Sequence, residues 1–397
     1  MNLVRRHPIA LALIALLLWS AASPLPALVD VATGAPAGAA DLTRPVSYVV
    51  GAPLSDVLDA LTFLSLDRAK FLFGTWAVAL CLWGALRGGP WWRRVTRAVA
   101  APLGLVVLAA AAVLLPRPVP RLVSADPGLT VIDYHSHTEA SHDGRPGWSA
   151  TDVARWHAVQ GFEAAYVTDH NRLFERRTDT AIPLLPGAEW SVYRQHVLAL
   201  GQVVPLDPSR YNANTTSLLT LFPELHRAGA LSVASIPEYW ESHWDDLDDF
   251  VRAGLDGFEI INCAPRALAF PASARARVLG IARQHNLLVV GGSDNHGWGK
   301  VTCVWNLVAP SAHGYRANHV LARPLALLQA EWLAWTAPVT QPWFMFRSLG
   351  WPERVSWLTW ILVILIYRAT PRRAGDRSPA ILARALGVRQ QPPSDDR

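Results

Sequence analysis

Residues 129–144 read LTVIDYHSHTEASHDG, an apolar run that ends in a dense group of histidine and acidic side chains. The first part, Leu129–Tyr134, predicts a β-strand. His135 and His137 are two residues apart, so on extended backbone their imidazoles point to the same face. This segment therefore predicts a strand whose carboxyl end carries ligands for one shared metal site.

Predicted strands and helices alternate downstream of this segment. We expect strands at 162–167, 181–185, 230–235, 257–262 and 287–290. We expect helices at 149–160, 218–228, 244–253 and 272–285. Such alternation is typical of a parallel α/β architecture, here expected to be a barrel, in which functional groups gather where strands end and loops begin.

Imidazole and carboxylate groups follow the predicted strands in order. They lie in Thr168-Asp169-His170-Asn171, Pro186-Gly187-Ala188-Glu189 with His196 beyond it, Glu259-Ile260-Ile261-Asn262, and Gly291-Gly292-Ser293-Asp294-Asn295-His296. Strand ends of one barrel meet at one mouth, so these groups are expected to converge. Their mixture of nitrogen and oxygen donors suits Zn²⁺, Mn²⁺ or Fe²⁺ and does not suit Ca²⁺.

Over residues 129–310 the chain resembles the PHP (polymerase and histidinol phosphatase) family of metallohydrolases. The resemblance lies in four motifs that occur in the family's order: His135-Ser136-His137, Thr168-Asp169-His170, Pro186-Gly187-Ala188-Glu189 and Gly292-Ser293-Asp294-Asn295-His296. It implies a distorted (β/α)7 barrel with two or three metal ions, usually Zn, Mn or Fe. It also implies phosphoester hydrolysis, although the chain is similar as well to relatives that hydrolyse non-phosphate esters.

Carried over to this chain, the resemblance implies a set of metal ligands: His135, His137, Asp143, His170, Glu189, His196, Asp294 and His296. His142 is the alternative to Asp143, and the sequence does not choose between them. We expect catalytic roles for Asp169 and Glu259. Asp133 and Asp169 are expected to orient ligand histidines, although capping of the adjacent turns explains them equally well.

The chain departs from the family pattern at one position. The family usually has a His-Pro pair at the end of a middle strand, whereas this chain has Ile236-Pro237. Isoleucine cannot bind a metal, so either the site holds fewer ions or Glu238 or His243 replaces the missing ligand. For these two residues we favour a solvated loop at the start of the next helix.

The composition indicates a protein that is only partly soluble. Hydrophobic residues make up 51% of the 397 residues and charged residues only 17%, whereas soluble domains carry roughly 25% charged residues. This apolar content also excludes disorder throughout. A channel or transporter is not expected, because residues 117–350 hold most of the acidic and histidine residues without a long uncharged run.

We expect three membrane helices within residues 1–116, at about 8–29, 71–86 and 97–116. Residues 8–29 could instead be a signal peptide, because small residues lie at 21–23. The expected barrel domain follows at 117–350, then a possible fourth membrane helix at 351–368 and a flexible tail at 369–397.

Arginine placement predicts a multi-pass protein of the cell membrane with its barrel outside the cytoplasm. Four arginines lie in the short link 87–97, and more follow residue 367. The positive-inside rule puts both groups in the cytoplasm. On this prediction Cys263 and Cys303 could form a disulfide if their strands are neighbours, and two free thiols are the alternative.

We therefore expect a membrane-anchored, metal-dependent hydrolase, most simply a phosphoesterase that uses metal-activated water. Its expected partners are a small, phosphorylated ester substrate and the lipid bilayer. One alternative is a carboxyl-ester or carbamate hydrolase on the same barrel, and another, motivated by Ile236, is a degenerate module that binds a ligand without turnover. Nucleic acid is not expected as a partner, because no basic surface with interleaved aromatic residues is evident.

Overall fold

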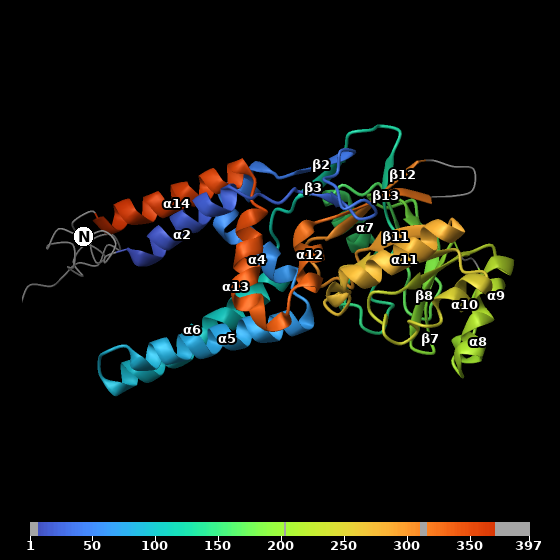
Figure 1. The fold of residues 1–397 in the computed structure, drawn as a ribbon, viewed down its shortest axis with the longest axis horizontal. Helices are drawn as coiled ribbons and strands as arrows, with labels where there is room; N and C mark the ends of the chain where they lie inside the picture. The colour runs from blue at the N-terminus through green and yellow to red at the C-terminus, as the bar shows by residue number, and fades with distance from the viewer. Residues whose placement is uncertain (1–6, 202–203, 310–315, 370–397) are drawn as a thin grey trace, which may run out of the picture.

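The computed structural model describes residues 7–201, 204–309 and 316–369 (Figure 1). The strands are β1 (Val29–Asp30), β2 (Ala40–Thr43), β3 (Arg121–Ser124), β4 (Thr130–Asp133), β5 (Ala164–Tyr166), β6 (Leu184–Leu185), β7 (Gly187–Val192), β8 (Gln195–Leu200), β9 (Leu231–Ser235), β10 (Gly257–Asn262), β11 (Leu288–Gly292), β12 (Val304–Ala309) and β13 (Arg316–Ala322). The helices are α2 (Pro8–Ala21), α3 (Val46–Val50), α4 (Ala52–Thr62), α5 (Leu66–Leu86), α6 (Trp91–Leu114), α7 (Ala150–Val159), α8 (Thr215–Leu219), α9 (Leu221–Arg227), α10 (Leu247–Arg252), α11 (Ala272–His285), α12 (Pro324–Leu328), α13 (Ala337–Arg347) and α14 (Trp351–Ala369).

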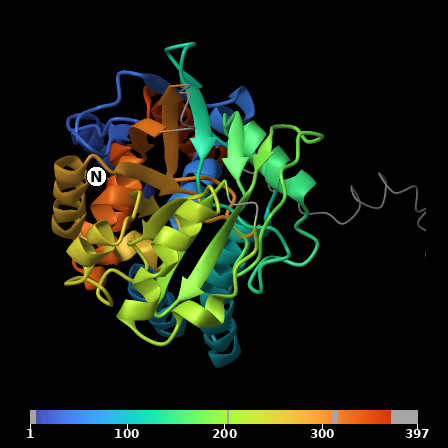
Figure 2. The same ribbon diagram turned by 90° about the vertical axis from the view of Figure 1, so that its right-hand side faces the viewer.

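The strands pair in two main sheets. Figure 2 views the molecule from the end at which these sheets lie. One sheet has the order β1-β13-β12-β4-β5-β6, the other has the order β11-β10-β9-β8-β7, and β2 pairs separately with β3. The expected α/β fold is present, but the expected all-parallel arrangement is wrong. β7, β8 and β9 pair antiparallel, as do β4, β12 and β13, because two hairpins interrupt the strand–helix alternation.

Two isolated bridges connect the main sheets at the strand ends that carry the polar motifs. Ser136 pairs with Asn295, and His170 pairs with Glu189, both in parallel orientation. In the described part of the chain these bridges do not extend into ladders, so the sheets do not close into a continuous barrel. The bridges nevertheless bring the loops after β4, β5 and β11 next to strand β7.

Local sequence signals explain where two of the helices that pack against the sheets begin or end. Helix α7 begins with a capping box, in which Ser149 and Asp152 satisfy each other's backbone N–H groups. Helix α11 begins after Pro271 and ends at Asn286, which adopts the left-handed conformation with φ 52°. Both helices bury one apolar face against the sheets.

Two helices, α5 and α6, are long and apolar enough to cross a membrane. In Figure 1 they lie side by side and extend away from the sheets. A side chain at Gly84 of α5 would collide with the backbone of Ala98 of α6, so glycine permits this close packing. Within the described residues, a third span requires that Ala334–Arg347 and Trp351–Arg368, which are bent by 113° at their junction, act together.

The segments expected to form the first and last spans pack against each other. Helix α2 is shorter than expected, and the guanidinium of Arg354 in α14 donates to the carbonyl of Leu17 in α2 at 2.9 Å. The chain that follows α2 joins the sheets, because β1 pairs with β13 and β2 with β3. The expected flexible tail lies outside the described residues, apart from residue 369.

Cys263 and Cys303 form a disulfide, which is one of the two alternatives that the sequence leaves open. Cys263 directly follows β10, and Cys303 directly precedes β12. The bridge therefore closes the segment that contains α11, β11 and the loop with Asp294 and His296. Cys81, on α5, is a free and exposed thiol.

Candidate metal centre

Strand β4 delivers His135 and His137 to a buried position between the two sheets. Nδ1 of His135 lies 3.0 Å from Oε1 of Glu259, and Nδ1 of His137 lies 3.3 Å from the hydroxyl of Ser141. These contacts leave the Nε2 atoms of both rings facing the cluster, 3.0 Å apart. The two imidazoles thus form a pair of donors, as the spacing in the sequence predicts.

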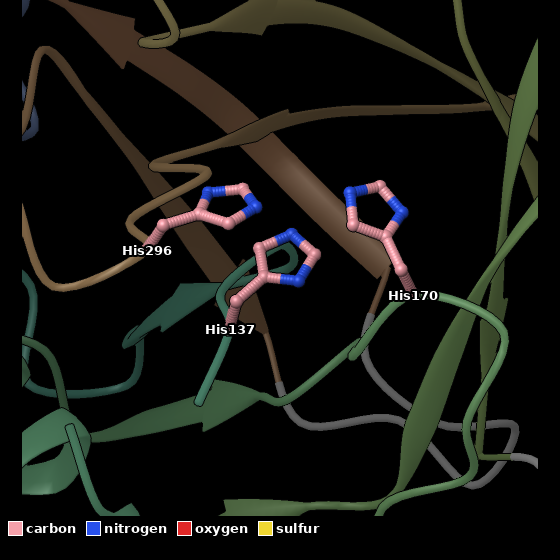
Figure 3. A group of neighbouring side chains, drawn as sticks. All are labelled: His137, His170 and His296. Carbon is pink, nitrogen blue, oxygen red and sulfur yellow. The ribbon is translucent and has the colours of Figure 1, made fainter. Parts of the chain in front are cut away.

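Three other loops and strands surround this pair. The rings of His137, His170 and His296 approach one another from the loops after β4, β5 and β11 (Figure 3). Asp143 reaches them from the first of these loops, with its carboxylate 3.1 Å from Nε2 of His296 and 3.6 Å from Nε2 of His170. The nearby His142 is mostly exposed, although it can share a site with Asp143 and His170.

Glu189 and His196 lie on the two strands of the β7–β8 hairpin. Oε1 of Glu189 is 2.6 Å from Nδ1 of His196, and its Oε2 is 3.1 Å from Nε2 of His135. The hairpin turns through Tyr193 and Arg194, which both adopt positive φ angles, 39° and 60°. Two-residue hairpins favour such angles but usually achieve them with Asn or Gly, so the sequence gives little sign of this turn.

Asp294 completes the centre from the loop after β11. Its Oδ1 is 3.0 Å from Nε2 of His137 and 3.3 Å from Nε2 of His135. Its φ is 48°, a left-handed conformation that is uncommon for a residue other than glycine and is often found at functional sites. A side chain at Gly292 would collide with both His135 and Glu259, so glycine allows the backbone to approach them.

The structure brings together every residue that the sequence predicts as a metal ligand. Overlapping groups of donor atoms lying within 4.8 Å of one another contain His135, His137, His142, Asp143, His170, Glu189, His196, Asp294 and His296. This closeness shows where the residues lie, and ligation itself stays a prediction.

Glu259 and Asp169 lie behind the cluster and hold its members in place. Glu259 is fully buried, contacts Nδ1 of His135 and accepts a hydrogen bond from the hydroxyl of Ser235. Asp169 accepts hydrogen bonds from both the N–H and the hydroxyl of Thr138, at 2.7 and 2.8 Å. These contacts are those of positioning residues, and the catalytic roles expected for both residues stay predictions.

Asp133 connects the loops after β4 and β11. It also contacts His157, a histidine for which the sequence predicts no role. Its Oδ1 accepts the backbone N–H of Ser293 at 3.0 Å, and its Oδ2 lies 2.8 Å from Nε2 of His157. All three side chains are buried. Asp133 therefore binds backbone N–H groups next to His135 and Asp294, which fits the expected capping of adjacent turns better than the orientation of a ligand histidine. The position of His157 on the buried face of a predicted helix is its only sequence signal.

The position at which the resemblance implies a histidine is occupied by a core residue. Ile236 is buried among apolar side chains. His243 is buried, so the expectation of a solvated position is wrong for it, and Asp246 and the carbonyl of Tyr193 hold it outside the cluster. Glu238, in contrast, is largely buried and lies 3.9 Å from Nδ1 of His196, so it borders the centre instead of lying in a solvated loop.

The charges of the centre are strongly coupled. Burial lowers the pKa of His135, but the carboxylates of Glu189 and Asp294 outweigh it and raise this pKa well above its usual value. Burial raises the pKa of Glu189, but the surrounding imidazoles hold it well below its usual range. Burial also lowers the pKa of His296, but the carboxylate of Asp294 outweighs this effect and raises the pKa to about 9. The ionised form of these buried carboxylates is thus stabilised by the positive charge around them.

The donor set fits a bound cation. Because Glu259 faces Nδ1 of His135, the neutral ring with its proton on Nδ1 would present the lone pair of Nε2 to the cluster, as a metal ligand requires. Glu189 Oε1 and Asp294 Oδ1 are buried and make no hydrogen bond, although imidazole nitrogens lie within 3.0 Å. A cation shared by these atoms would satisfy the two carboxylate oxygens and the Nε2 lone pair together.

No family profile and no curated protein matches this chain. Several solved structures are similar to parts of it, among them the following two. A candidate metal-dependent phosphoesterase from Bifidobacterium adolescentis is 18% identical, with 47% of this chain and 92% of that chain covered and a TM-score of 0.34. PsfC from Pseudomonas syringae is 19% identical, with 55% and 98% covered and a TM-score of 0.36. These scores do not establish a common fold, and the candidate site rests on its own geometry.

Replacing Glu259 with glutamine is expected to weaken metal binding by about 10- to 100-fold while leaving the fold intact. The amide keeps the shape of the carboxylate but removes the charge that fixes the tautomer of His135. Metal affinity is measured by competition with a chelator. Glu163→Gln is the control, because this exposed glutamate contacts the N–H of Val131 away from the cluster. Equal affinities in both variants would contradict the positioning role.

Proposed function

We propose that this chain is a membrane-anchored, metal-dependent hydrolase of the PHP type that cleaves phosphoesters with water. The supporting observation is the convergence of five histidines with Glu189, Asp294 and Asp143 on one buried centre. The bridges between the two sheets support a distorted barrel as the underlying fold. We further propose that two or three ions, of Zn, Mn or Fe, occupy this centre.

The chain's own residues would prepare the centre for this reaction. A divalent ion bound there would act as a Lewis acid and lower the pKa of a water molecule toward 7. Glu259 would keep Nε2 of His135 available as a donor, and Ser191, 3.0 Å from Nδ1 of His170, would orient that ring. Asp169 and Asp133 would hold the loops that carry the donors. Serine and cysteine nucleophiles are then not required.

We also propose that the protein crosses the membrane more than once and that the metal centre lies outside the cytoplasm. The disulfide supports this side, because disulfides persist mainly in oxidising compartments. The tip of the α5–α6 hairpin supports it too, because Arg87, Arg93, Arg94 and Arg97 gather there and positive charge favours the cytoplasm.

The full chain, purified in detergent, is expected to contain at least one equivalent of Zn, Mn or Fe and to hydrolyse p-nitrophenyl phosphate or its diester faster than p-nitrophenyl acetate. Elemental analysis and a colorimetric assay measure both. Hydrolysis of the acetate alone would favour the carboxyl-ester alternative. Less than one equivalent of metal after incubation with excess ion would favour a binding module, the alternative that Ile236 motivates.

A further inference from the structure

A cavity of about 400 Å³ lies directly beside the metal centre. Its polar end is formed by Asp143, Asp294 and His296, which belong to the centre itself. Its volume lies within the range of about 300–1,000 Å³ that is typical of small-molecule sites. A substrate whose reacting group is held by the centre would therefore extend into this cavity.

The opposite end of the cavity is apolar and is built by the membrane region. Leu61 comes from α4, Leu66 and Phe73 from the first turns of α5, and Val113 from the last turn of α6. These are the ends of α5 and α6 nearest the sheets, and the two helices extend away from there (Figure 1). The cavity thus joins the metal centre to the base of the candidate membrane hairpin.

The surroundings of this base are suited to contact with lipid. Phe71, Trp76 and Val78 of α5 and Val106 of α6 are exposed apolar side chains on the same two helices that line the cavity. If α5 and α6 cross the bilayer, the base of the hairpin lies at the membrane surface, where lipid head groups and the ends of their chains are found. A molecule could then pass between lipid and cavity without exposing its chain to water.

We propose that the substrate is a lipid phosphoester whose phosphate is bound at the metal centre and whose hydrocarbon chain lies in the cavity. This proposal rests on the proposed hydrolase function and names its substrate class. A small polar phosphoester would contact the centre but would leave Leu61, Leu66, Phe73 and Val113 without an apolar partner. A hydrocarbon chain fills this end and continues along the hairpin.

The proposal is tested with n-alkylphosphonates, which cannot be hydrolysed as esters, from methyl- to octylphosphonate. They are titrated calorimetrically into the metal-loaded full chain in detergent, with the heats for empty micelles subtracted. Affinity is expected to rise roughly two- to fourfold for each methylene group that enters the cavity. Binding is read directly, so the result does not depend on turnover.

A matched pair of variants on α6 separates the cavity from the detergent. Val113→Trp fills the apolar end and is expected to weaken octylphosphonate binding by tenfold or more while leaving methylphosphonate binding unchanged. Val106→Trp makes the same change at an exposed position outside the cavity and is expected to behave as the wild type. Both positions are exposed enough for tryptophan to be accommodated without disturbing the core.

Two results would overturn the proposal in different ways. Equal affinity for all chain lengths, or equal loss in both tryptophan variants, would reject the lipid substrate while the hydrolase function stands. Absence of binding at every chain length, together with absence of phosphoester hydrolysis, would reject the hydrolase function and with it the substrate class.

Discussion

Replacing His135 with alanine is expected to reduce both the metal content and the phosphoesterase activity of the full chain, the activity by at least about a thousandfold. Nε2 of His135 faces His137, Glu189 and Asp294 at 3.0 to 3.3 Å, so its loss removes a donor from the middle of the cluster. The remaining carboxylates would then face one another with less positive charge between them. Elemental analysis and initial rates at saturating metal measure the two effects.

His226→Ala is the matched control, because this partly exposed histidine pairs with Asp256 on the surface, away from the centre. It is expected to keep the wild-type metal content and rate. Circular dichroism of both variants establishes whether the fold is retained. A folded His135→Ala protein with full metal content would show that the ions lie elsewhere, and the proposed centre would have to be abandoned.

The elements that position the centre could be predicted where residues within or next to an element determine its bounds. Helix α11 has its expected bounds, because Pro271 precedes it and Asn286 follows it. Strand β10 also has its expected bounds, because its apolar residues are buried on both faces. The convergence of the histidine motifs could also be predicted, because each motif directly follows a buried strand.

The hairpins that make the sheets mixed could not be predicted, because their signals are not local. The β7–β8 turn uses Tyr193 and Arg194 where glycine or asparagine would be expected. Both strands of this hairpin are buried, so they lack the alternation of polar and apolar residues that marks a half-exposed strand. The resemblance therefore implies Glu189 and His196 as ligands, although the strands that hold them are not evident in the sequence.

The role of residues 29–62 also depends on contacts distant in sequence. Asp59 in α4 pairs with Arg117 after α6 and lies 3.4 Å from Arg323 before α12. These side chains are buried and connect α4 to the segments after α6 and before α12. In the sequence they appear as scattered charges between apolar runs, and only the fold shows that they form one cluster. The proximity of the metal centre to the candidate membrane helices likewise depends on contacts between residues that are distant in sequence.

Removing the disulfide with Cys263→Ser and Cys303→Ser is expected to lower the melting temperature of the full chain by roughly 4–16 °C, equivalent to about 2–4 kcal/mol. The two cysteines are 40 residues apart in the sequence, so the bridge restricts a long loop in the unfolded chain. That loop carries Asp294 and His296, and Asn262, next to Cys263, donates to the carboxylate of Asp294 at 3.1 Å. Metal affinity is therefore expected to fall together with stability.

Cys81→Ser is the control, because this thiol is free and exposed on α5, and its melting temperature is expected to be that of the wild type. Mass spectrometry of the purified full chain under non-reducing conditions is expected to find Cys263 and Cys303 joined. Free thiols at both positions would remove the bridge and also the main support for a centre outside the cytoplasm. In that case the arginines of the 87–97 link would be the remaining guide to orientation, and they constrain the side of the hairpin tip alone.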